Sequence, residues 1–114
     1  MKFAAWMMYG SAALHLAAPA VMGASTGALI LAGVGALWAV LAFALAHMTN
    51  RDGANRGGGR ALGYLCFVLV LAGACVALGQ PWGAPEWLAY GFAAFDAAAA
   101  ATLFGVLWRR PEPA

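Results

Sequence analysis

The sequence predicts an all-α integral membrane protein, a four-helix bundle with up-down-up-down topology and both termini on the inner side of the membrane (N-in/C-in). The first observation is composition: of 114 residues, 65% are hydrophobic and 9% are charged, whereas about a quarter of the residues in a soluble domain are charged. The second is length, because four apolar stretches of about 20 residues, each long enough to cross a bilayer, fill most of the chain. We therefore expect a single transmembrane domain over residues 1–114.

The predicted helices begin and end where glycine, proline or charged residues interrupt the apolar stretches. They cover about residues 3–22, 27–48, 61–79 and 86–108, and the polar segment 49–60 is expected to form a cytoplasmic loop. Short connectors of this kind join antiparallel neighbours in helix bundles.

The first apolar stretch has two interpretations. Residues 18–20, Ala-Pro-Ala, have the small-x-small form of a signal-peptide cleavage site, so residues 1–20 could be a cleaved signal peptide. However, Ser11 and His15 interrupt the stretch, and Lys2 is its only basic residue. We favour a retained helix.

The basic residues predict the orientation of the bundle. If the four helices alternate in direction, every Lys and Arg falls on one side, and the two opposite connectors contain none. These residues are Lys2, Arg51, Arg56, Arg60, Arg109 and Arg110. The positive-inside rule then places both termini in the cytoplasm of a bacterial-type inner membrane. Six basic residues spread over three places do not form a nucleic-acid-binding surface.

The second predicted helix carries a stripe of small residues at alternating spacings of four and three. The stripe consists of Ala28, Ala32, Gly35, Ala39, Ala42 and Ala46. Because small residues let helix backbones approach closely in lipid, we expect the stripe to be a helix-packing surface. The alternative is a chance alignment in a chain that is rich in alanine.

Asp96 is the only acidic residue inside an apolar span, and a carboxylate at the bilayer centre costs about 2.5–3.5 kcal/mol on insertion scales. His15 lies thirteen residues from Lys2, and Asp96 lies thirteen residues from Arg109. At 1.5 Å per residue, both are about 20 Å from the inner boundary, and Trp38 lies at a similar height. We therefore expect His15 and Asp96 to contact each other, since paired groups are better tolerated in a membrane.

Two further residues belong to this layer. Ser11 lies one helical turn before His15 on the same face, so it joins His15, Trp38 and Asp96 in what we call the polar cluster. Pro19 cannot donate a hydrogen bond to the carbonyl of His15, four residues earlier, so a kink is expected there. The polar cluster either fastens the helices or titrates as part of a proton pathway.

The sequence gives little support for catalysis, because it contains no recognisable nucleophile and base pair and no repeated Cys or His spacing. His15 and His47 are predicted to lie about 18 Å apart along the membrane normal, which argues against a bis-histidine haem. We expect no cofactor and no metal. The leading hypothesis is a non-enzymatic accessory or assembly subunit that packs through small-residue helix faces against a second copy or a larger membrane complex.

Two alternative functions remain open at this point. One is a small oligomeric, proton-linked transporter or channel that uses Asp96 and His15. The other is an accessory subunit of a redox or photosynthetic complex.

Overall fold

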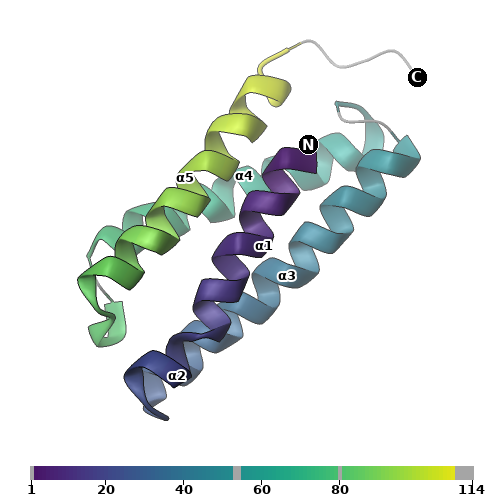
Figure 1. Cartoon of the computed structure of the whole chain (residues 1–114). Helices are drawn as coiled ribbons and strands as arrows, with labels where there is room; N and C mark the ends of the chain where they lie inside the picture. Colours follow the sequence, from purple (N-terminus) through teal and green to yellow (C-terminus); the bar gives the residue numbers. More distant parts are fainter. Residues whose placement is uncertain (1, 53–54, 80, 110–114) are drawn as a thin grey trace.

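Helices make up nearly all of the described part of the chain, which in this computed structural model comprises residues 2–52, 55–79 and 81–109. Figure 1 shows the long helices lying side by side, with the start of the first helix and the end of the last helix near the same end of the bundle. The elements are α1 (Lys2–Leu16), α2 (Ala18–Met22), α3 (Thr26–Asp52), α4 (Gly57–Leu78), the 3-10 turn η1 (Pro81–Gly83) and α5 (Glu86–Leu107). The all-helical class predicted from composition is therefore confirmed.

Three of these helices, α3, α4 and α5, are long and apolar enough to cross a membrane, as expected for a membrane protein. Their bounds differ from the sequence expectation mainly around the polar connector. α3 continues to Asp52 and α4 already begins at Gly57, so the connector is shorter than the predicted segment 49–60.

The first predicted helix is divided into α1 and α2, with the break at Ala17. Pro19 explains the break, because proline has no N–H to donate to the carbonyl of His15. Helical hydrogen bonds persist on both sides of the break, from Ala17 N to Ala13 O (3.0 Å) and from Val21 N to Ala17 O (3.2 Å). The missing bond therefore bends the chain without ending its helical course.

The bundle is held together around α1, which packs closely against both α3 and α5. α4 packs extensively against α5 and less extensively against α3. Gly35 lies where α3 comes close to α1: a Cβ atom added there would lie 2.8 Å from the carbonyl oxygen of Ala12 and 2.8 Å from the Cβ of His15. The backbones of α1 and α3 are therefore in direct contact, and the seam between α3 and α4 is the looser one.

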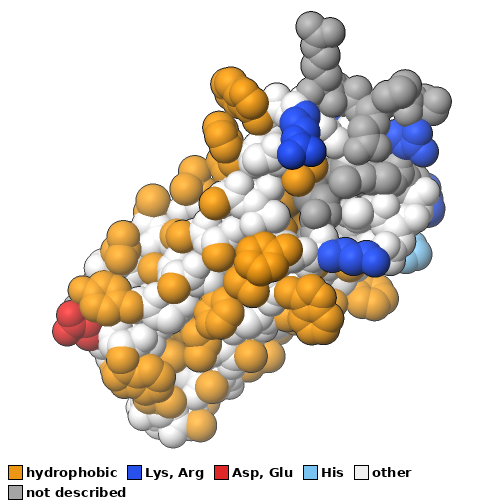
Figure 2. Space-filling view, turned by 45° about the horizontal axis from the view of Figure 1, so that its top comes forward, with side chains coloured by type: hydrophobic (Ala, Val, Ile, Leu, Met, Phe, Trp, Pro, Cys, Tyr) orange, Lys and Arg blue, Asp and Glu red, His pale blue; other side chains and the backbone are white. Residues whose placement is uncertain are grey.

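The charged side chains are segregated along the bundle. Figure 2 shows Lys and Arg gathered at one end of the molecule, with apolar side chains covering much of the visible surface between the two ends. The helix ends there carry Lys2, Arg51, Arg56, Arg60 and Arg109, and Arg110 lies outside the described residues. The α3–α4 connector is fixed at this end, because Asn55 Nδ2 donates to the carbonyl oxygen of Val106 over 3.0 Å.

Candidate functional site

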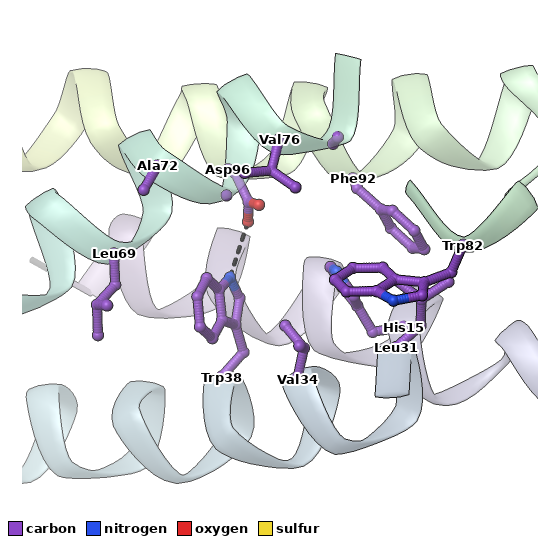
Figure 3. Close-up of a pocket in the computed structure, with 12 residues that line it drawn as sticks. His15, Leu31, Val34, Trp38, Leu69, Ala72, Val76, Trp82, Phe92 and Asp96 are labelled. Atoms are coloured by element: carbon purple, nitrogen blue, oxygen red, sulfur yellow. Dashed lines mark hydrogen bonds between the residues drawn. The ribbon is translucent and has the colours of Figure 1, made fainter. Parts of the chain in front are cut away.

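The centre of the site is a hydrogen bond between α3 and α5. Trp38 Nε1 donates to Asp96 Oδ1 over 2.9 Å, as drawn in Figure 3. Both side chains are enclosed, with 6% of Trp38 and 1% of Asp96 exposed. The hydrogen bond places the two residues at one level of the bundle, as the central position of Trp38 in its helix predicts. A neutral indole donor thus stabilises the carboxylate that the sequence places in an apolar span.

Ser11 is the hydrogen-bond partner of His15 among the described residues. The side chain of Ser11 is fully buried and lies near the carboxyl group of Asp96. His15 Nδ1 lies 2.7 Å from the carbonyl oxygen of Ser11 and 3.3 Å from its Oγ. Because a carbonyl oxygen only accepts, Nδ1 donates to it.

The direct His15–Asp96 contact expected from the sequence is replaced by separate hydrogen bonds, from Trp38 to Asp96 and from His15 to its own helix. Among the described residues, the hydrogen-bond partner of His15 is Ser11, on its own helix. The imidazole stacks on the ring of Phe92, with centroids 3.8 Å apart and an interplanar angle of 13°. Phe92 precedes Asp96 by one turn of α5, so stacking holds the imidazole one turn away from the carboxylate. All four residues of the polar cluster are nevertheless brought together, from α1, α3 and α5.

Sequence reasoning missed Phe92 and Trp82. The spacing of four residues between Phe92 and Asp96 places both on one face of α5, which is a signal that could have identified Phe92. No comparable signal exists for Trp82. It lies in η1 with φ 57°, in the left-handed region, and its position depends on how the turn folds back over the bundle.

A cavity of about 210 Å³ opens beside the polar cluster, in the seam between α3 and α4. His15, Trp38 and Asp96 contribute polar groups to its wall, as Figure 3 shows. The remaining wall is apolar and includes Leu31, Val34, Leu69, Val76, Trp82 and Phe92. Since Ala72 and Val76 line the cavity and are exposed, the cavity reaches the surface of the bundle.

The small-residue stripe of α3 lies inside the bundle. Ala28, Gly35 and Ala42 are buried, and Ala32, Ala39 and Ala46 are half-buried. This burial, together with the close approach at Gly35, shows that the stripe packs against α1 and does not face outward. The stripe is a helix-packing surface within the chain.

A different row of small residues is exposed, on α5. It consists of Ala94, Ala97, Ala101 and Gly105, spaced by three, four and four residues. A Cβ atom added to Gly105 would have nothing within 4 Å. Exposed aromatic residues lie at both ends of the row, with Tyr90 before it and Trp108 after it.

Within residues 2–52, 55–79 and 81–109, no three His, Cys, Asp or Glu residues are grouped so that they could hold a metal ion. Comparison of the chain with known protein families, with curated proteins and with solved structures finds no match.

Proposed function

We propose that this chain is a multi-pass protein of a bacterial-type inner membrane with both termini in the cytoplasm. The three apolar helices support the membrane location, and α1 with α2 would supply the fourth crossing. The gathering of Lys and Arg at one end of the bundle supports the orientation, because the basic end of a membrane protein faces the cytoplasm.

Its proposed role is that of a non-enzymatic accessory subunit that associates with a second copy of itself within the membrane, alone or inside a larger complex. The exposed row Ala94, Ala97, Ala101 and Gly105 carries this proposal. In lipid, small residues allow two helix backbones to come close enough for extensive van der Waals contact. The stripe of α3 cannot serve this purpose, because α1 already covers it.

The test measures oligomeric state with substitutions that block close approach. We expect the wild-type protein to be a dimer in mild detergent by size-exclusion chromatography with light scattering, and the double variant Ala101→Leu/Gly105→Leu to be a monomer. Gly33→Leu is the matched control, because Gly33 is also exposed in the middle of a long helix with nothing within 4 Å of an added Cβ. A monomeric wild type, or a dimer that survives the double substitution, contradicts the proposal.

A proton-linked transporter is a second candidate, which is favoured by one observation: His15 and Asp96 both line the cavity between α3 and α4. In this case the wild-type protein in vesicles would carry a proton flux, and both Asp96→Asn and His15→Gln would abolish it while the protein remained folded. Vesicles that contain wild-type protein and show no flux above empty vesicles would reject this candidate.

A further inference from the structure

One nitrogen of the buried His15 ring has no hydrogen-bond partner among the described residues. Nδ1 is engaged by the carbonyl of Ser11, and within the described residues no hydrogen bond to Nε2 is formed. Nε2 is nevertheless not sealed inside protein, because Thr49 Oγ1 is the only fully buried unpaired side-chain N or O atom in that part of the chain. His15 lines the cavity, so Nε2 is the ring nitrogen available to a molecule bound there.

The surroundings of Nε2 define what would complement it. In the neutral imidazole with its hydrogen on Nδ1, Nε2 is a hydrogen-bond acceptor. Asp96 also lines the cavity, and its donor Trp38 Nε1 is already engaged, so Nε2 and the carboxylate are the acceptors that a ligand would meet. The aromatic rings of Trp38, Trp82 and Phe92 supply flat apolar walls around them.

We propose that this cavity binds a small, flat aromatic molecule that carries a hydroxyl group, of the class of phenols and quinol rings, with the hydroxyl donating to His15 Nε2. The volume suits one or two fused rings, since an apolar cavity of about 150 Å³ is enough to hold benzene. Stacking and edge contacts with the aromatic walls favour a planar ring. The cavity reaches the surface along the looser α3–α4 seam, so a lipid-soluble ligand can enter from the bilayer.

The main experiment compares two probes that differ only in the hydroxyl group, 1-naphthol and naphthalene. Binding to the purified full-length protein in mild detergent is followed by quenching of tryptophan fluorescence, since Trp38 and Trp82 line the cavity. We expect 1-naphthol to bind wild type at least tenfold more tightly than naphthalene. His15→Phe keeps an aromatic ring beside Phe92 but removes the acceptor, so it should lower the affinity for 1-naphthol to that for naphthalene and leave naphthalene binding unchanged.

The outcomes that overturn the proposal are equal binding of the two probes to wild type, no saturable binding of either, or an equal loss of both in His15→Phe. A second pair of variants tests the location without changing His15. Ala72→Phe places a ring in the cavity and should abolish saturable binding of 1-naphthol. Ala61→Phe makes the same change at another exposed position of α4 that does not line the cavity, and it should bind as wild type does. Retained binding in Ala72→Phe contradicts the assigned site.

Discussion

Trp38 on α3 and Asp96 on α5 are joined by a 2.9 Å hydrogen bond across the interior of the bundle. The backbones of α3 and α5 scarcely contact each other, because α1 and α4 lie between them. The long indole side chain therefore links two helices that are otherwise held only through their neighbours. The bond also provides a donor for a carboxylate that would be costly to leave unpaired in an apolar interior.

Substitutions of Asp96 separate the role of its acceptor from the role of its charge. Asp96→Asn retains a carbonyl oxygen for Trp38 Nε1, whereas Asp96→Leu leaves that buried N–H without an acceptor. Because an unsatisfied buried donor costs about 1–3 kcal/mol, we expect the Leu variant to be less stable than the Asn variant by about this amount. Denaturation in mixed detergent micelles measures the difference, and equal stability of the two variants would show that the hydrogen bond does not fasten the helices.

Removal of the donor from the other side should have a similar effect. Trp38→Phe keeps an aromatic ring but deletes the N–H that donates to Asp96. Loss of a hydrogen-bond partner of a charged buried group is expected to lower the free energy of unfolding by at least about 1–3 kcal/mol. Trp6→Phe is the matched control, since Trp6 is 68% exposed and should change the melting temperature little. If both substitutions lower the melting temperature equally, the loss reflects tryptophan packing in general.

Glycines of α3 that lie two residues apart should respond in opposite directions. Gly35→Ala places a methyl group against the backbone of α1, and overpacking of this kind typically costs about 1–3 kcal/mol. Gly33→Ala meets open space and should be neutral or stabilising, because alanine is favoured over glycine in a helix by about 0.5–1 kcal/mol. We therefore expect the melting temperature of Gly35→Ala to lie below that of wild type and the melting temperature of Gly33→Ala to equal or exceed it, when both are measured under identical conditions. Similar values would mean that α1 can shift away from Gly35 without loss.

The features that were predictable from the sequence are those that depend on local residue order. Apolar stretches gave the helical class, distance from the basic anchors placed His15 and Asp96 near one level, and the missing N–H of Pro19 gave the interruption after α1. None of these requires knowledge of which way a side chain turns.

The pairing inside the polar cluster was not predictable in this way. Whether His15 meets Asp96 depends on the rotation of α1 against α5 and on the choice of rotamer, and the imidazole bonds to its own helix and stacks on Phe92 instead. Similarly, the spacing of small residues on α3 indicates a packing surface but does not say whether α1 or another molecule covers it. The position of Trp82 is set by the folding of the η1 turn, about which composition and periodicity carry no information.

Asn55 offers a test of how the basic end of the bundle is held. Its side chain is 2% exposed, its Nδ2 donates to the carbonyl oxygens of Val106 (3.0 Å) and Arg109 (3.3 Å), and its Oδ1 accepts from Arg60 Nη1. Asn55 thereby satisfies carbonyl groups at the end of α5, where a helix leaves its last carbonyls unpaired.

Asn55→Asp has the same shape but cannot donate, and it places a negative charge near the negative end of the α5 dipole. We expect this variant to be less stable by about 1–3 kcal/mol, the usual cost of buried groups left unsatisfied, and to be cleaved faster by trypsin in the α3–α4 connector. Asn50→Asp makes the same chemical change at an exposed position of α3 and should behave as wild type. Faster cleavage in both variants would attribute the effect to added charge, whereas unchanged cleavage in Asn55→Asp would show that the two donated hydrogen bonds do not hold the connector against α5.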